Sequence, residues 1–245
     1  MKGSTKLNTQ AENTESHQFN INIPQIKRVL IYCFLVQLIL NLALIYLIEQ
    51  GHSNFYGLKR FYFDAEESIP TFFSSMNLFI SAALLALISS IKANLSDPFK
   101  THWQVLSLLF ILLAMDEIAE VHELTIDPMI RMYQFSGFLR FPWVILGFIF
   151  MTFFSIAYFR LWMNLPKPYR LGFFFSCLIY LTGAIGVETI SANIFISLEE
   201  SPKDLSYNLV TTVEESFEML GIMMFIIVLL SYIKSLKSTI SLVFK

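Results

Sequence analysis

The sequence predicts an all-α, polytopic membrane protein with six transmembrane helices and both termini in the cytoplasm. Hydrophobic residues make up 55% of the 245 positions and charged residues only 15%, and the mean hydropathy is +0.59. An average soluble domain carries about 25% charged residues, so this chain has too little charge to cover a soluble globule. The net charge of −2 also excludes a nucleic-acid-binding protein that relies on bulk basicity.

Six segments are long and apolar enough to cross a bilayer, which takes about 20 residues of α-helix. Three of them are almost free of charge and are predicted over about 29–49, 68–91 and 141–163. The other three are interrupted by acidic residues and are predicted over about 103–122, 171–198 and 208–233. Together they form one transmembrane domain over 29–236, flanked by a disordered tail at 1–28 and a short tail at 237–245, both cytoplasmic.

The basic residues orient these spans. With the N-terminus inside, 12 of the 17 Lys and Arg residues fall on the inner side, as the positive-inside rule requires. By contrast, 16 of the 19 Asp and Glu residues fall in outer loops or in the outer half of a span. Acidic loop residues follow no strong topology rule, so insertion alone does not explain why the acids gather on one side.

The interrupted spans place these acids at about the same depth, in the outer half of the membrane. The third span contributes Asp116, Glu117, Glu120 and Glu123, the fifth contributes Glu188, and the sixth contributes Glu214, Glu215 and Glu218. Each charged residue near a helix centre costs about 2–3.5 kcal/mol to insert. Because no Lys or Arg is predicted at this depth, the group needs a metal ion, protons, water or another chain to balance it.

This concentration predicts a metal-binding site in the outer half of the helix bundle, with room for one or two ions. The predicted ligands are Asp116, Glu117, His122, Glu188, Glu214, Glu215 and Glu218. The residues expected beside them are Glu67, Glu120, Glu123, Ser191 and Thr211. Catalytic zinc prefers sites rich in His, and only His52 and His122 are predicted on the outer side. A carboxylate-dominated site favours Fe or Mn, with Ca, Mg and Zn as alternatives.

Four sequence elements resemble those of an uncharacterised family of bacterial six-span inner-membrane proteins. They are Glu67-Ser-Ile-Pro-Thr-Phe-Phe-Ser-Ser, Asp116-Glu117-x4-His122-Glu123, Gly186-Val-Glu188 and Glu214-Glu215-x-x-Glu218-Met-Leu-Gly221. The resemblance covers most of 61–232. It implies a shared acidic intramembrane site and no particular activity. The topology inferred from the basic residues places this site on the periplasmic side.

Three classes of function fit such a site. The first is metal-dependent oxidation or hydrolysis of a lipid-like substrate within the bilayer. The second is a transporter or channel in which the same acids relay protons or bind a cation in transit. The third is a non-catalytic subunit of a membrane complex. The sequence leaves open whether the protein is an enzyme, which substrate and partners it has, and its oligomeric state.

Other polar and aromatic residues are interpreted as structural. Asp64 and Asp204 are expected to be solvated acids of the outer loops. The aromatic run at 55–63 is expected to form an interfacial belt or a short amphipathic helix, with a lid over a lipid substrate as the alternative. Gln37 and Asn41 stand out as polar interruptions of the first span. With Ser81 and Thr182 they are the polar residues expected in the inner half, where a transporter would need a route to the cytoplasm.

Overall fold

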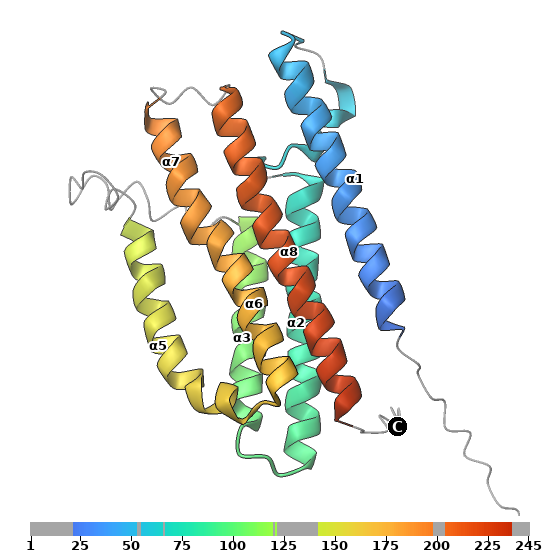
Figure 1. Ribbon diagram of the computed structural model, residues 1–245, viewed down its shortest axis with the longest axis vertical. Coiled ribbons are helices and arrows are strands. Elements are labelled where there is room, and N and C mark those ends of the chain that lie inside the picture. The colour runs from blue at the N-terminus through green and yellow to red at the C-terminus, as the bar shows by residue number, and fades with distance from the viewer. Residues whose placement is uncertain are drawn as a thin grey trace, which may run out of the picture.

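The computed structural model describes residues 22–52, 55–65, 67–119, 121, 142–197 and 204–236, and within these ranges it contains helices and no β-strand. Successive long helices run up and down through one elongated bundle (Figure 1). α1 spans Ile23–Glu49, α2 Ile69–Asn94, α3 Lys100–Ala119, α5 Pro142–Asn164, α6 Lys167–Leu181, α7 Glu188–Ser197 and α8 Leu205–Ser235. The 3-10 helix η1 (Tyr56–Phe61) precedes α2, and the π-helix η4 (Thr182–Val187) joins α6 to α7.

Five of the described helical stretches are long and apolar enough to cross a membrane. They are α1, α2, α3, the continuous stretch Lys167–Ser191 and α8. α5 is a sixth long helix, at the edge of the bundle (Figure 1). On its surface Phe153 is 69% exposed and Ile156 is 71% exposed, as expected of side chains that face lipid. The all-α, multi-pass architecture is thus confirmed, whereas six crossings and cytoplasmic termini stay predictions.

The first helix begins earlier than the sequence predicted. α1 starts at Ile23, whereas a disordered tail was expected as far as residue 28. The side-chain oxygen of Asn22 accepts a hydrogen bond from the N–H of Gln25 at 3.2 Å, and Pro24 occupies the first turn. Both features start a helix locally, before the apolar segment is reached. The last part of the predicted tail is therefore helical.

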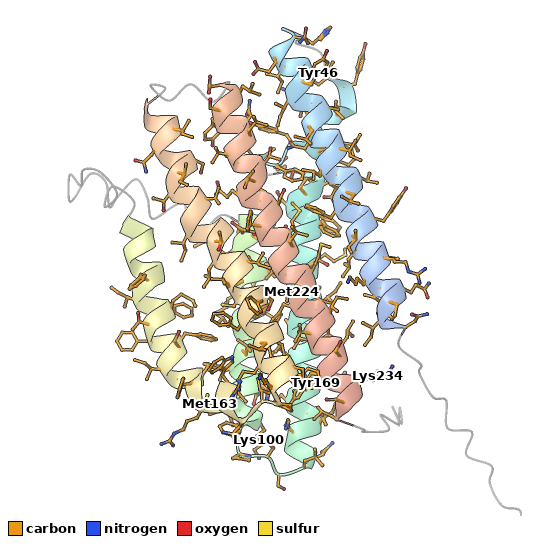
Figure 2. All side chains as sticks on the ribbon, viewed as in Figure 1. Tyr46, Lys100, Met163, Tyr169, Met224 and Lys234 are labelled. Atoms are coloured by element: carbon orange, nitrogen blue, oxygen red, sulfur yellow. The ribbon has the colours of Figure 1, made fainter. Side chains whose placement is uncertain are left out.

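Bulky apolar side chains close one end of the bundle, which we call the closed end. Leu85 and Ile88 on α2 are fully buried and pack in the same cluster as Trp103 on α3. The Trp103 ring stacks on that of Tyr232 with centroids 5.6 Å apart. Figure 2 shows Lys234 near this end, so basic and aromatic residues gather here. Aromatic and aliphatic side chains thus fill most of the described core at this level.

The turn between α2 and α3, also at the closed end, is held by an ion pair. Lys92 Nζ lies 2.8 Å from one carboxylate oxygen of Asp97, and the N–H of Phe99 donates to the other at 2.8 Å. Partial burial would raise the pKa of Asp97, but the hydrogen bonds from Lys92 and Phe99 outweigh it, so the pKa lies below its usual value. This is the one ion pair among the described residues.

α6 and η4 approach α8 closely at two glycines. A Cβ atom at Gly221 would lie 2.7 Å from the backbone nitrogen of Tyr180, and one at Gly183 would lie 2.7 Å from the carbonyl oxygen of Glu214. Neither contact is tolerable, so only glycine permits this spacing. The close approach brings the acidic stretch of α8 against the junction of α6 and η4.

Candidate functional site: a carboxyl cluster within the helix bundle

Five carboxyl groups from three helices lie in one cluster, and four of them surround one tyrosine. They belong to Glu117 on α3, Glu188 at the start of α7, and Glu214, Glu215 and Glu218 on α8. The Tyr180 side chain, on α6, is in electrostatic contact with four of them, and Glu214 is in contact with Glu215 and Glu218. We call these five residues the carboxyl cluster. The structure thus brings together side chains that are up to 101 positions apart in the printed sequence.

The cluster lies in the half of the bundle opposite the closed end. Figure 2 labels Met224 about halfway along α8, and the three carboxyl groups of α8 precede it by one to three turns. Tyr46 is labelled near the same end as η1, so η1 and the cluster share this half of the molecule. The acids of α8 therefore lie in the half of the bundle that also contains η1, whereas their depth in a membrane stays a prediction.

A π-helical segment sets the direction of Glu188. η4 occupies the middle of the stretch that runs from α6 into α7, and Glu188 is the residue directly after it. A π-helix has a wider turn than an α-helix and changes which face the following residues occupy. Gly183 within this segment allows it to lie against Glu214 and Glu218. Such insertions are frequent at functional sites, which agrees with the position of this one beside the cluster.

Hydroxyl groups from neighbouring helices contact the cluster. Ser191 on α7 donates to a carboxylate oxygen of Glu214 at 2.7 Å and lies 3.0 Å from the carbonyl oxygen of Glu188. Ser74 on α2 is 1% exposed, and its hydroxyl interacts with the carboxyl group of Glu117. Hydroxyl groups of α2 and α7 thus support two carboxyl groups of the cluster.

The carboxyl groups of the cluster lie away from the ion pair between Lys92 and Asp97, which is at the closed end. Carboxylates at short range in a medium of low polarity repel one another, and a cation or protons must compensate their charge. Positive charge beside the cluster, from a cation, protons or basic side chains, would therefore stabilise it.

The oxygen donors suit a hard divalent cation, but they are not drawn together as a ligand set. Within the described ranges, no three Asp, Glu, His or Cys side chains converge on a point that could hold a metal ion. Three residues of the predicted site, Glu120, His122 and Glu123, lie outside the described residues. The chemistry of the donors fits the predicted metal, whereas its binding stays a prediction.

The remaining predicted residues have varied surroundings. Asp116 is half-buried and in electrostatic contact with Glu117. Glu67 is exposed and lies directly before the N-cap of α2. The Thr211 hydroxyl donates within its own helix, to the carbonyl oxygens of Tyr207 at 3.1 Å and Asn208 at 3.2 Å. Thr211 therefore supports the helix near the cluster and does not contact a carboxyl group through this proton.

A polar network, which the sequence did not predict, covers the cluster on the side of η1. Asn41 on α1 donates to the Thr212 hydroxyl at 2.8 Å and accepts from the backbone N–H of Phe63 at 3.1 Å. The Tyr62 hydroxyl donates to the side-chain oxygen of Asn208 at 2.6 Å. These bonds tie the segment after η1 to α1 and α8. Asn41 thus has a specific structural role in the first span.

The surroundings of Asp64 differ from those expected of a solvated loop acid. Its carboxylate is exposed, yet it accepts a hydrogen bond from the Tyr207 hydroxyl at 3.1 Å and lies 3.4 Å from the Tyr62 hydroxyl. Burial and the charge of Asp64 raise the pKa of Tyr62, which keeps this phenol protonated as a donor. Asp64 is also in electrostatic contact with Glu214 and Glu215. It belongs to the edge of the site.

Fold and site together define a multi-pass helical membrane protein with a half-buried carboxyl cluster inside the bundle. Residues 30–233 match the model of a family described as a domain of unknown function (DUF8692). The chain therefore belongs to this family, and the matched range contains the whole carboxyl cluster. No curated protein and no solved structure matches the chain.

Proposed function

We propose that this protein is a six-helix protein of the bacterial inner membrane that binds a divalent metal ion at the carboxyl cluster. The observation that supports the proposal is the gathering of five half-buried carboxyl groups from three helices, four of which are in electrostatic contact with Tyr180. A divalent cation would balance two of these charges at once, and oxygen donors favour Fe or Mn, with Ca, Mg and Zn as alternatives.

Access to the site is proposed from the periplasmic side. Polar groups reach the cluster from the end where η1 lies, through the network around Asn41 and Asn208. At the closed end, by contrast, the core is filled by aromatic and aliphatic side chains such as Trp103 and Leu85. The rings of Phe110 and Phe225 also stack, with centroids 4.8 Å apart. A site open on one side suits reaction or binding better than passage across the membrane.

Metal-dependent oxidation or hydrolysis of a lipid-like molecule is the activity that we propose for this site. A metal ion held there would polarise a bound group or supply a reactive hydroxide when bound. The chain itself would contribute the charge of the cluster, the orientation of Glu214 by Ser191, and the exclusion of water by the closed end. Substrates dissolved in the bilayer reach this depth directly.

Elemental analysis of protein purified in detergent without chelator tests the proposal. We expect stoichiometric metal in the wild type and loss of it in the double variant Glu215→Gln/Glu218→Gln. The matched control is Asp97→Asn, which removes one carboxylate at the closed end and is expected to keep the metal. Absence of stoichiometric Fe, Mn, Zn or Ca, with no uptake on reconstitution, would refute the metal site.

Cation or proton transport is the second candidate, and one observation favours it. Ser74, Asn77 and Ser81 form a stripe of buried polar side chains on α2 that extends from the cluster toward the closed end. The stripe ends before the fully buried Leu85 and Ile88. Transport would require this packing to open. A flux into proteoliposomes that Glu218→Gln abolishes would support transport, and an inactive wild type would speak against it.

The non-catalytic subunit remains the third hypothesis. In that case a basic chain would balance the carboxyl cluster in place of a cation. Such a subunit would co-purify with a basic membrane partner and would be unstable without it. Stable, metal-loaded protein purified alone would exclude this role.

A further inference from the structure

The turn between α5 and α6 carries only basic charge. No Asp or Glu occurs between Asp127 and Glu188 in the sequence, and the described part of this stretch contains Arg160, Lys167 and Arg170. Arg160 lies in the last turns of α5, and the other two lie in the first turn of α6. None of the three forms an ion pair with a described residue. The positive charge of this turn is therefore not compensated within the described part of the chain.

The turn lies at the closed end of the bundle. Leu161 and Leu165 are buried in the hydrophobic cluster of this end. Figure 2 labels Met163 and Tyr169 there as well. The half-buried ring of Trp162 belongs to the same turn, and Trp and Tyr are enriched where a membrane helix meets the lipid headgroups. We therefore expect the turn to lie at the level of the headgroups.

Arg170 reaches back from α6 to α5. Its guanidinium group lies over the Trp162 ring, 5.4 Å from the ring centroid, and one of its nitrogens is 3.7 Å from the sulfur of Met163. The indole N–H of Trp162 donates to the carbonyl oxygen of Arg170 at 3.1 Å, which ties the same two residues together a second time. Neither an aromatic ring nor a thioether neutralises a guanidinium group. The charge of Arg170 is thus held in place and is free to meet an anion.

The other two cations lie one helical turn from this contact. Arg160 is three residues before Met163 on α5, and Lys167 is three residues before Arg170 on α6, so each is a neighbour of its partner on the helix surface. Both side chains are exposed. The N-cap of α6, Pro166, offers no side-chain hydrogen bond, so the positive end of the helix dipole adds to the same charge. Three cations and a helix N-terminus therefore lie together at this turn.

The neighbouring turn at the closed end, between α2 and α3, is built differently. There Lys92 is paired with Asp97 at 2.8 Å. The positive-inside rule explains why Lys and Arg are numerous at an inner surface, and it applies to both turns. It does not explain why one turn has an acid of its own and the other has none. The α5–α6 turn is thus suited to an anion that comes from outside the chain.

An apolar surface adjoins these cations. The rings of Phe159 on α5 and Phe174 on α6 lie on either side of Trp162 in sequence, with centroids 6.2 and 6.5 Å from that of the indole ring. Phe159 is 56% exposed and Phe174 is 47% exposed. Such rings favour contact with acyl chains over contact with water. Cations beside an exposed apolar surface match a molecule with an anionic head and an apolar tail.

We propose that the α5–α6 turn binds the phosphate group of an anionic phospholipid. Arg170 and Arg160 present paired N–H donors that match phosphate oxygens, and Lys167 adds a compact charge. Basic pockets between membrane helices on the cytoplasmic side take anionic headgroups in this way. The acyl chains would lie along the exposed rings of Phe159 and Phe174. This site is separate from the carboxyl cluster and does not depend on the proposed metal.

Native mass spectrometry of the full chain in detergent, titrated with phosphatidylglycerol, tests the proposal. We expect the wild type to retain phosphatidylglycerol in preference to phosphatidylcholine. The double variant Arg160→Gln/Lys167→Gln should bind phosphatidylglycerol more weakly by about fivefold for each charge removed. It leaves the contact between Arg170 and Trp162 intact, so the turn keeps its packing. Arg170→Gln should weaken binding further, because it removes the cation that this contact holds in place.

Lys59→Gln/Arg60→Gln is the matched control, because it removes two exposed cations from η1 at the other end of the bundle. It should bind phosphatidylglycerol as the wild type does. Equal losses in the two double variants would overturn the proposal, since binding would then depend on total charge alone. Wild-type affinity in Arg160→Gln/Lys167→Gln would overturn it too, and so would a wild type that does not distinguish the two lipids. Displacement of the lipid by an equal concentration of inorganic phosphate would show a site for free phosphate instead.

Discussion

The substitution Gly221→Ala tests how closely α6 and α8 must approach to form the carboxyl cluster. The new Cβ would lie 2.7 Å from both the backbone nitrogen and the Cβ of Tyr180. Ordinary van der Waals contact begins near 3.4 Å, so the two helices must separate by about 0.7 Å or more. Overpacking of this kind costs about 1–3 kcal/mol. It also displaces Tyr180 relative to Glu218, one turn before the glycine.

Thermal unfolding in detergent, followed by circular dichroism, measures this cost. A loss of about 1–3 kcal/mol corresponds to a decrease in Tm of roughly 2–12 °C for a chain of this size. Gly147→Ala is the matched control, because a Cβ at Gly147 on α5 meets nothing within 4 Å. It should leave Tm unchanged or raise it slightly, since Ala favours a helix more than Gly does.

Comparing the stability of the two variants tests whether α6 and α8 approach each other this closely. If Gly221→Ala is as stable as Gly147→Ala, the close approach of α6 and α8 does not exist as described. If it is less stable but binds metal as the wild type does, the position of Tyr180 is irrelevant to the site. Either result would contradict the conclusion that the contact between Gly221 and Tyr180 assembles the carboxyl cluster.

Three further predictions concern the supporting contacts. Asn41→Leu should destabilise the protein by about 1–3 kcal/mol in thermal unfolding, because the N–H of Phe63 and the hydroxyl of Thr212 lose their hydrogen bonds to Asn41. The control is Gln37→Leu, which should be nearly neutral because the side-chain oxygen of Gln37 has no partner among the described residues. Equal losses of stability in the two variants would contradict the role of Asn41. Trp103→Ala should cost about 3–5 kcal/mol, because it opens the closed end, and a loss below about 1 kcal/mol would show that this end is loosely packed. The pKa of Asp97 is lower in the folded protein than its ordinary value of 3.8, so its contribution to stability is present above pH 3.8 and is lost as the pH falls through the folded pKa. Asp97→Asn should remove this part of the pH dependence at a cost below about 1 kcal/mol, and unchanged acid stability of the variant relative to wild type would refute it.

Much of the architecture followed from hydropathy, because span length and helical geometry constrain it strongly. The acids of α3, α7 and α8 could be placed at one depth from their distance along each helix alone. Depth does not determine which helices are neighbours, however. That Gly183 and Gly221 pack against partners on the facing segments depends on tertiary contacts that are not visible in a single sequence.

The residues that sequence reasoning missed are polar groups whose partners are remote in the chain. Tyr180 is typical, since a tyrosine in an apolar span looks like core filler until four carboxyl groups surround it. Asp64 and Tyr207 are 143 positions apart and meet only because the segment after η1 folds back over α8. Gly221, by contrast, offered a local indication, as a small residue one turn after Glu218 on the same helix.

The most direct test of the central claim is the equilibrium affinity for Mn²⁺ of three variants, each altering one helix. They are Glu117→Gln on α3, Glu188→Gln on α7 and Glu218→Gln on α8. If the three helices build one site, each variant should bind Mn²⁺ at least about tenfold more weakly than the wild type, a loss of roughly 1.4 kcal/mol. Wild-type affinity in all three variants would contradict a shared carboxyl site, and so would a wild type that binds no metal.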